Sequence, residues 1–292
     1  MSTIFLRPIR SMQIAANHRA EGDYTITTGV TSRDELGALA KDLDTLACRL
    51  DETSRESQKL EQLQKDFVSN VSHELRTPVT VLRSSLEALC DGVIQEPKEV
   101  AEYHDSMLSE TIHLQRMIGD LLELSRLQNP DYVMKFASLD LTQTIDDALR
   151  SANHIEAKKN ITLVREVSGS DCMVYGDYGR IRQLILILLD NAIKFSPENS
   201  SVNLSLCGTA STCVLTVSDS SPGVPEEAQP YVFDRFYTSS GAANPQGTGL
   251  GLFIANQIAQ RHNADICMEN KAESGCRITV VFWKYRPGNN TM

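Results

Sequence analysis

The stretch VSHELRTPVT, residues 71–80, places a histidine, a glutamate and a threonine on one predicted helix. With Val71 as a core position, His73 follows about 200° around a helix of 3.6 residues per turn, so its imidazole is predicted to face solvent. A neutral imidazole is a nucleophile at about pH 7, and the neighbouring Glu74 carboxylate can hold its other ring N–H. Thr77 lies one turn further on the same face, where its hydroxyl can position a water.

Pro78 lies inside the same predicted helix, where a proline removes a backbone N–H and crowds the preceding turn. It is predicted to bend the helix near His73 and to let it flex as a partner docks. The competing interpretation of His73 is an ordinary surface histidine, because the predicted core positions belong to its apolar neighbours: Val71, Leu75, Val79 or Leu82, and Leu86.

Two apolar stripes at heptad spacing predict long helices on either side of DGVIQEPKE, residues 91–99. Gly92 is a predicted helix end and Pro97 a predicted helix start, so residues 52–128 are expected to form an antiparallel helical hairpin. Two helices cannot bury such narrow stripes alone; a homodimer that forms a four-helix bundle can, and the alternative is a hairpin packed against the rest of its own chain. The stripes are Leu36, Leu39, Leu43, Leu46, Leu50, then Leu60, Phe67 and Val71, and afterwards Val100, Tyr103, Met107, Leu114, Met117, Leu121 and Leu124.

The N-terminal part predicts a helix, an extended connector and a second helix. Residues 8–21 are amphipathic, GDYTITTGVTSRDE at 22–35 reads as the connector, and residues 34–50 carry the first stripe. The longest aliphatic run, LILILL at 184–189, is far shorter than the roughly 20 residues that span a bilayer. The opening MSTIFLRPIR is too short for a signal peptide, and it fits either the stub of a membrane helix or an ordinary terminus.

Composition limits the class of function. Hydrophobic residues make up 41% of the 292 residues and charged residues 23%, which is typical of globular domains. The net charge of −10 argues against nucleic acid as a partner. Seven scattered cysteines without a CxxC pair indicate reduced, packing thiols rather than disulfides or a metal site.

From about residue 135 the pattern alternates between strands and helices, which predicts an α/β sandwich with helices on one face of a mixed sheet. The predicted strands are 161–167, 201–206, 213–219, 264–270 and 277–283, and the predicted helices are 141–159, 178–196 and 250–263.

Three stretches of this second half suit a nucleotide. In LLDNAIKFS, Asn191 and Lys194 share a helical face and offer an amide and an ammonium to a cation and to phosphates. In VSDSSPGVP, Asp219 can accept a hydrogen bond from an exocyclic amine and Gly223 lets a flat ring approach the backbone. In QGTGLGLFIANQIA, glycines at 247, 249 and 251 open a helix, where free N–H groups favour phosphate. The small-residue loop TSSGAANPQ, residues 238–246, precedes these glycines and is predicted to be a mobile lid.

The stretch FVSNVSHELRTPVT, residues 67–80, resembles the phosphoacceptor box of the sensor histidine kinases of bacterial two-component systems. The resemblance implies that His73 is the phosphoacceptor, that Glu74 is its acid/base partner, and that Thr77 serves in hydrolysis of a partner's phosphoaspartate. The helix, connector and helix, with Pro8 and DELG at 34–37, resemble a HAMP domain. The implied division is a HAMP-like segment at 1–52, a dimerisation and phosphotransfer hairpin at 53–130, and an ATP-binding domain at 135–286.

The three nucleotide stretches, taken together and in order, resemble the N, G1 and G2 boxes of the GHKL ATPases, whose α/β sandwich is of the Bergerat type, and FDRFY at 233–237 resembles their F box. The resemblance implies that Asp219 reads adenine and Gly223 lines its pocket, and that Lys194 meets phosphates. Asn191 would hold Mg²⁺. The G2 residues would wrap the phosphates: Gly247, Thr248, Gly249, Leu250, Gly251 and Leu252. The F-box residues Phe233, Arg235 and Phe236 would support the lid, and Arg235 would also face the phosphoryl group.

The whole resemblance implies ATP- and Mg²⁺-dependent phosphorylation of a histidine, and transfer to an aspartate on the receiver domain of a response regulator. It also implies that this chain is the cytoplasmic portion of a sensor anchored in the plasma membrane through a segment absent here. A GHKL machine of the chaperone, topoisomerase or mismatch-repair kind is the other class, but such proteins lack the SHELRTP hairpin.

Two residues depart from the family pattern. Ile187 stands where the N box usually has a second asparagine, and an isoleucine can neither coordinate a cation nor bond a phosphate. Ser221 stands for the first glycine of G1, where its side chain is expected to crowd the nucleotide or restrict the turn. Both changes affect ATP or Mg²⁺ handling and neither affects His73. The alternative function is therefore a phosphatase-biased or catalytically impaired relay.

Overall fold

The computed structural model describes residues 2–129, 131–156, 159–238, 247–271 and 274–284. The chain forms two compact units, Met1–Glu74 and Leu75–Met292, and a single helix passes from the first into the second. Within the part that the structure describes, none of the helices combines the length and the apolar content that crossing a bilayer requires.

The first unit has the predicted order of helix, connector and helix. Helix α1 (Ser2–Ala20) is longer than expected, with Pro8 inside it, since a proline removes only one hydrogen bond of the helical ladder. Helix α2 (Glu35–Cys90) begins where the Asp34 carboxylate accepts the backbone N–H of Gly37 at 3.1 Å, a side-chain N-cap.

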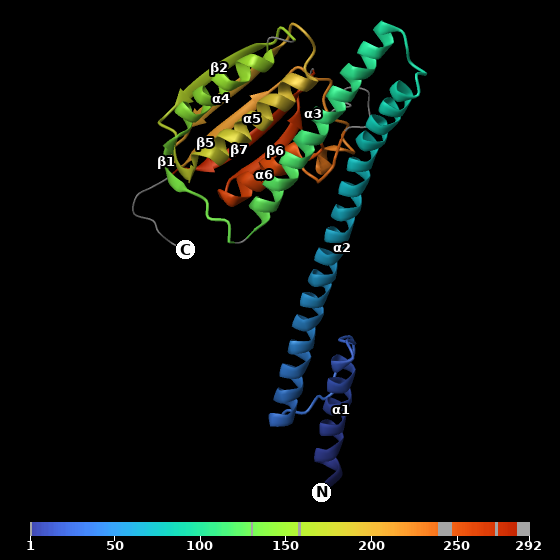
Figure 1. Cartoon of the computed structure of the whole chain (residues 1–292). Coiled ribbons are helices and arrows are strands. Elements are labelled where there is room, and N and C mark those ends of the chain that lie inside the picture. Colours follow the sequence, from blue (N-terminus) through green and yellow to red (C-terminus); the bar gives the residue numbers. More distant parts are fainter. Residues whose placement is uncertain (1, 130, 157–158, 239–246, 272–273, 285–292) are drawn as a thin grey trace. The chain divides into compact units, whose positions relative to one another are not determined.

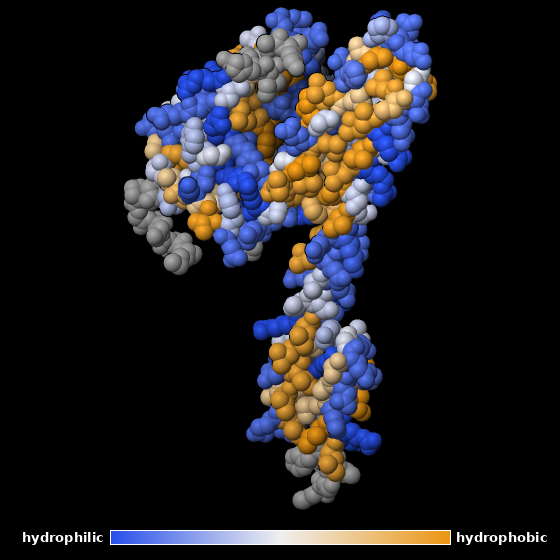
Figure 2. Space-filling view, in the orientation of Figure 1, coloured by the Kyte–Doolittle hydropathy of each residue, from blue (hydrophilic) through white to orange (hydrophobic). Residues whose placement is uncertain are grey.

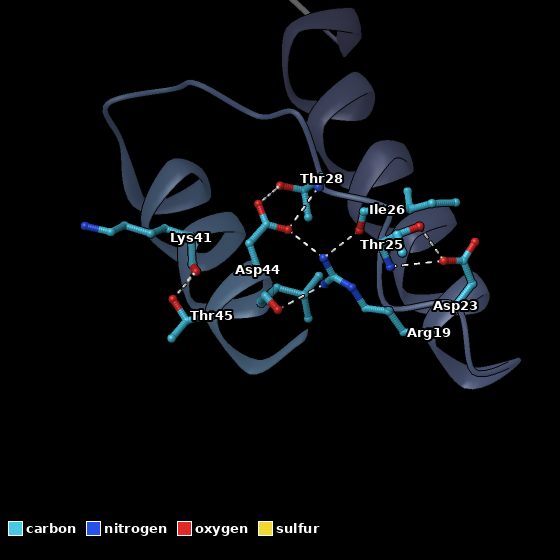
Figure 3. A network of polar contacts seen from close by, with 9 residues as sticks. Arg19, Asp23, Thr25, Ile26, Thr28, Lys41, Asp44 and Thr45 are labelled. Atoms are coloured by element: carbon cyan, nitrogen blue, oxygen red, sulfur yellow. Dashed lines mark hydrogen bonds and ion pairs between the residues drawn. The ribbon is translucent and has the colours of Figure 1, made fainter. Parts of the chain in front are cut away.

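One buried arginine fastens the connector to both helices (Figure 3). Arg19 of α1 donates to the carbonyl oxygen of Ile26 in the connector and to that of Leu43 on α2, both at 3.0 Å. It also pairs with the Asp44 carboxylate at 2.6 Å. Asp44 in turn accepts the backbone N–H of Thr28 at 3.0 Å and its hydroxyl at 2.8 Å. Buried charges need such partners, so this network defines the path of the connector.

The predicted hairpin ends are confirmed. Helix α2 stops at Cys90, Gly92 adopts a φ of +66°, and α3 (Pro97–Gln128) opens with Pro97 in its first turn. Figure 1 shows the chain reversing direction between the two helices. Pro78 lies within the uninterrupted α2 and is buried, whereas Val79 and Leu86 are exposed.

The last turns of α3 pack within the chain, against α6. Met117, Leu124 and Leu127 are its buried residues, with at most 1% of each exposed. Met117 and Leu124 had been expected in a seam between helices. Both are instead buried within this one chain, in a helix that contacts α6, and a heptad pattern alone does not distinguish the two kinds of burial.

The α/β part contains a five-stranded sheet in the order β2-β4-β5-β7-β6, in which only β2 and β4 are parallel. Helices α4, α5 and α6 lie on one face of this sheet (Figure 1), as the sequence predicted. The bounds are β2 Thr162–Gly169, β4 Ser201–Gly208, β5 Thr212–Ser218, β6 Asp265–Asn270, β7 Cys276–Trp283, α4 Leu141–Glu156, α5 Tyr178–Phe195 and α6 Gly251–Arg261. The sequence predicted that the helix corresponding to α4 spans 141–159, and residues 157–158 of that range lie outside the described residues.

A second, two-stranded sheet was not predicted. It pairs β1 (Phe136–Asp140) with β3 (Met173–Asp177) in antiparallel register. Strand β1 buries only Leu139, so it has no alternating apolar pattern to detect.

The aliphatic run at 184–189 forms the centre of the core. Leu184, Ile185, Leu188 and Leu189 on α5 are fully buried, and alternate residues of β4 and β5 are buried beneath the helices. Burial of each such side chain stabilises the fold by about 1.5–3 kcal/mol. All seven cysteines are free thiols. Only Cys172, Cys213 and Cys276 are buried, so the prediction that the cysteines serve mostly in packing is wrong.

Candidate nucleotide and phosphoacceptor sites

The phosphoacceptor stretch lies on the surface of α2. His73, Glu74 and Thr77 are all exposed, which agrees with the predicted outward position of the histidine. The hydroxyls of Ser72 and Thr80 donate to the carbonyl oxygens four residues before them, at 2.8 Å each. These serine and threonine side chains therefore bond within the helix.

A cavity of about 400 Å³ lies between α5, the strand ends, α6 and α3. Most predicted nucleotide residues line it, from the N, G1 and G2 stretches together: Asn191, Lys194, Asp219, Gly223, Gly247, Thr248, Gly249, Gly251 and Leu252. The two departures, Ile187 and Ser221, line it as well. The sequence spacing thus identified residues that the fold brings into one concave site.

Asp219 follows β5 and is 8% exposed. Its Oδ1 accepts two backbone N–H groups at 2.8 Å, those of Ser221 and Cys276, so the carboxylate is held in one orientation. Both bonds end on Oδ1, which leaves the lone pairs of Oδ2 as acceptors. This arrangement suits recognition of an exocyclic amine on a base.

The expectation that Ser221 restricts the turn is not met by its backbone angles. Ser221 is absent from the described residues with positive φ, and its Oγ accepts the N–H of Gly223 at 3.4 Å. Gly223 does have a φ of +84°, and a Cβ there would lie 3.0 Å from Oδ1 of Asn270. The glycine is therefore required by its own backbone and by Asn270, a reason that the sequence did not reveal.

The N-box helix presents mixed chemistry. Lys194 forms an ion pair with Asp190, and both line the cavity beside Asn191. Ile187, one turn earlier, presents methyl groups near the start of α6: a Cβ on Gly251 would lie 3.5 Å from its Cγ2. The expected metal-binding amide is replaced by apolar surface in the cavity itself.

The G2 loop is shaped by Phe236. Gly249 has a φ of +65°, and a Cβ there would lie 2.7 Å from the Phe236 backbone, whose own φ is +60°. Gly251 then starts α6, so the unpaired N–H groups of its first turn border the cavity. Of the predicted lid, residues 239–246 lie outside the described residues.

Arg235 lies over the ring of Phe253, 4.9 Å from its centroid, and burial lowers the pKa of its guanidinium. Among the described residues that line the cavity, Phe233, Arg235, Phe236 and Leu250 do not occur. Arg235 contacts Phe253 of α6, and the Phe236 backbone borders Gly249. The predicted role of Arg235 at the phosphoryl group stays a prediction.

Two cavity residues come from α3 and were not predicted, Arg116 and Asp120. Oδ2 of Asp120 accepts the hydroxyl of Thr248 at 2.7 Å. Burial raises the pKa of Asp120, a neighbouring Asp190 adds to this, and the Thr248 bond and the charges of Lys194 and Arg116 oppose it. A helix of the hairpin carries no local signal that it will border a cavity in another fold.

The cavity fits Mg²⁺ only in part. Within the described residues, no group of three His, Cys, Asp or Glu side chains is placed to hold a metal, and Ile187 offers no ligand. Asn191 supplies one amide oxygen. Since Mg²⁺ on a nucleotide usually keeps several waters and takes most other ligands from phosphates, a single protein amide is compatible with it.

Three families match the chain. Residues 176–286 match "Histidine kinase-, DNA gyrase B-, and HSP90-like ATPase", residues 63–130 match the "His Kinase A (phospho-acceptor) domain", and residues 1–52 match the "HAMP domain".

Curated relatives match over most of this chain. The signal transduction histidine-protein kinase BaeS of Escherichia coli (strain K12) is 34% identical over 94% of this chain and 57% of its own length. The histidine-protein kinase/phosphatase MprB of Mycobacterium sp. (strain KMS) is 31% identical over 97% of this chain and 54% of its own length. The sensor-like histidine kinase SenX3 of Mycolicibacterium smegmatis is 30% identical, over 88% and 67%. The chain thus spans little more than half the length of the first two.

Solved structures agree. The Acinetobacter baumannii histidine kinase AdeS is 26% identical, with a TM-score of 0.59 over 73% of this chain and 98% of that one. The histidine kinase ThkA, solved in complex with response regulator protein TrrA, shares the fold with a TM-score of 0.66 at 22% identity, over 82% of this chain and 67% of that one. Family models match the N-terminal, central and C-terminal parts of the chain, and curated histidine kinases match most of its length. This chain belongs to the sensor histidine kinase family.

Proposed function

We propose that the chain uses ATP to phosphorylate His73 and passes the phosphoryl group to an aspartate of a response regulator. The observation that carries this is the combination of an exposed His73–Glu74 pair with a cavity lined by all three nucleotide stretches. The names of the relatives, and the ThkA complex with its regulator, support the same function.

In the proposed reaction, His73 Nε2 attacks the γ-phosphorus of ATP in line with the bridging oxygen. An N–P bond forms, the bond between the γ-phosphorus and the β–γ bridging oxygen breaks, and ADP leaves. Glu74 holds the other ring nitrogen, so it selects the reactive tautomer and stabilises the imidazolium as its charge develops. In the cavity, Asp219 binds the adenine amine, Gly223 lines its pocket, and the G2 loop holds the phosphates.

We propose Mg²⁺ as the cofactor, held by Asn191 and the phosphates. When bound it offsets negative charge on the transferring group. Lys194 adds a fixed cation, and the first turn of α6 adds N–H donors. Because Ile187 removes one ligand, the site depends more on Asn191 than a site with two amides would.

We propose that the division of the chain is 1–52, 53–130 and 135–286, and that it acts as a homodimer. Exposed apolar residues follow the hairpin (Figure 2): Val79 and Leu86 on α2, and Leu108, Ile112, Ile118 and Leu122 on α3. A second copy would cover them in a four-helix bundle. Sedimentation should give a dimer for wild type, a monomer for Ile118→Glu, and a dimer for Val167→Glu on the exposed strand β2. A monomeric wild type would refute the dimer.

We propose that the full protein is a membrane-anchored sensor and that this chain is its cytoplasmic portion, with a regulator docking near His73. The match of residues 1–52 to the HAMP domain supports the anchoring.

The decisive experiment incubates the purified chain with γ-labelled ATP and Mg²⁺. Wild type should gain acid-labile, base-stable label, His73→Gln should gain none, and His104→Gln, at an exposed histidine of α3, should label like wild type. Labelling of His73→Gln would show that the phosphoacceptor is another residue.

The second candidate is a phosphatase-biased relay, which the apolar Ile187 inside the cavity favours. It predicts no label in wild type, together with dephosphorylation of a phosphorylated regulator that is lost in Thr77→Ala. Labelling of wild type at a rate set by ATP would reject this candidate.

A further inference from the structure

Asp120 belongs to the hairpin helix α3, yet it lines the cavity of the α/β fold. Its Oδ2 accepts the hydroxyl of Thr248, 2.7 Å away, inside the loop proposed for the phosphates. A threonine hydroxyl has one proton to donate, so Thr248 cannot donate to Asp120 and to a phosphate oxygen at once. The two bonds are alternatives.

The charges around Asp120 point to the same competition. Lys194 and Arg116 lie within electrostatic reach of its carboxylate, and so does Asp190. Lys194 is already paired with Asp190. The cation proposed for the phosphates is therefore flanked by two carboxylates, and a triphosphate entering the cavity meets like charge at Asp120.

The loop that carries Thr248 is confined on its other side. Gly249 packs against the backbone of Phe236, where a Cβ would lie 2.7 Å away. The loop is thus held by Phe236 at Gly249 and by α3 at Thr248. Separating Thr248 from Asp120 requires either rotation of the Thr248 side chain or withdrawal of the helix.

Helix α3 is fastened to the α/β fold by further contacts. Glu123 pairs with Arg180 of α5, and Arg180 also meets the hydroxyl of Tyr132 at 2.6 Å. Arg261 of α6 donates to the carbonyl oxygen of Asn129 at 2.8 Å. The buried residues of α3 add apolar contact. Asp120 is therefore presented to the cavity by a docked helix.

We propose that Asp120 is a stand-in anion for the nucleotide phosphates, so that docking of α3 on the α/β fold and binding of ATP oppose each other. The inference rests on the proposed ATP site. By linkage, phosphates that weaken docking must be bound less tightly when α3 is docked, by the same factor. Nucleotide would then loosen the hairpin from the domain that has to deliver the phosphoryl group.

The test measures affinity for ATP, ADP and adenosine, without and with Mg²⁺, in the whole chain. Asp120→Asn keeps an acceptor for Thr248 and removes the charge, so it should bind ATP about fivefold or more tightly than wild type. The gain should be smaller for ADP and absent for adenosine. Asp120→Ala should gain at least as much, and Asp105→Asn, at an exposed carboxylate of the same helix, should gain nothing.

Unchanged ATP affinity in Asp120→Asn, or an equal gain for adenosine, would overturn the antagonism while leaving the ATP site intact. Weaker ATP binding by Asp120→Asn only in the presence of Mg²⁺ would identify Asp120 as a metal ligand and would also overturn the antagonism. If neither wild type nor Asp120→Asn binds ATP, the proposed function fails along with it.

A nucleotide-free double-mutant cycle tests the contact itself. The shifts of the urea midpoint caused by Asp120→Ala and Thr248→Val should not add in the double variant, because both remove the same bond. Additive shifts would show that the bond does not form in solution and would remove the basis of the proposal.

Discussion

The imidazole Nε2 of His262, at the end of α6, accepts the backbone N–H of Asp177 at 3.0 Å. Its Nδ1 lies 2.7 Å from the carbonyl oxygen of Ile258, so Nδ1 carries the proton and the ring is neutral. Asp177 caps α5 by accepting the N–H of Arg180 at 3.1 Å. One imidazole thus joins the two helices that border the nucleotide cavity.

Acid should weaken this junction. Burial lowers the pKa of His262 below its ordinary 6.5, while the Ile258 carbonyl and the Asp177 charge oppose the shift. The unfolded chain therefore binds the proton more readily, so the contribution to stability is complete above 6.5 and is lost as pH falls through the lowered value. Urea unfolding between about pH 7 and pH 5 should show a falling free energy of unfolding.

The matched variants separate this group from others. His262→Gln should lose about 1–3 kcal/mol at neutral pH and show a shallower pH dependence than wild type. His104→Gln should retain both the stability and the slope. An identical slope in His262→Gln would assign the acid sensitivity to another group.

Gly249→Ala should weaken nucleotide binding. The new Cβ would need a φ of +65° and would meet the Phe236 backbone at 2.7 Å, so the loop has to move. Calorimetric titration with ATP should find at least a tenfold loss of affinity, which is about 1.4 kcal/mol. Gly119→Ala, on α3 with nothing within 4 Å, should bind like wild type. Normal ATP affinity in Gly249→Ala would show that the loop does not hold the phosphates.

Arg180→Met should destabilise the Leu75–Met292 unit. Arg180 is 9% exposed and bonds Glu123, Gln183 and Tyr132. Its loss removes the bond to the Tyr132 hydroxyl and leaves Glu123 paired with Arg126 alone. The free energy of unfolding should fall by about 2–3 kcal/mol. Arg277→Met removes an exposed pair with Glu269 and should cost within about 0.5 kcal/mol. Equal effects would mean that the buried cluster is no stronger than a surface ion pair.

Ile187→Asn should restore a metal ligand. Ile187 lines the cavity one turn before Asn191, so the new amide would face the same space. Mg²⁺-dependent labelling of His73 should accelerate, by up to about 10²-fold where the missing ligand limits the rate. ATP titration with and without Mg²⁺ checks the cause, since affinity should rise only with the metal. Unchanged affinity and rate would show that the departure is harmless.

Local chemistry predicted much of the fold. Gly92 and Pro97 marked the turn between α2 and α3 because one tolerates positive φ and the other suits a helix start. The nucleotide stretches were recognised because, together and in order, they resemble the N, G1 and G2 boxes of the GHKL ATPases. The roles assigned to individual residues stay predictions.

The parts that the sequence did not predict depend on contacts between distant segments. Strand β1 pairs with β3, Met117 of α3 is buried within the chain, and Asp120 of the same helix lines the cavity and bonds Thr248. Gly223 was predicted to be flexible, but its neighbour Asn270, which a side chain there would meet, is distant in sequence.

The Arg19 guanidinium touches α1, the connector and α2 at once. A displacement of α1 must therefore carry the connector and this part of α2 with it, or break the ion pair between the buried Arg19 guanidinium and Asp44. Displacement of α1 is therefore expected to move α2 as well, because the connector is tied to both helices.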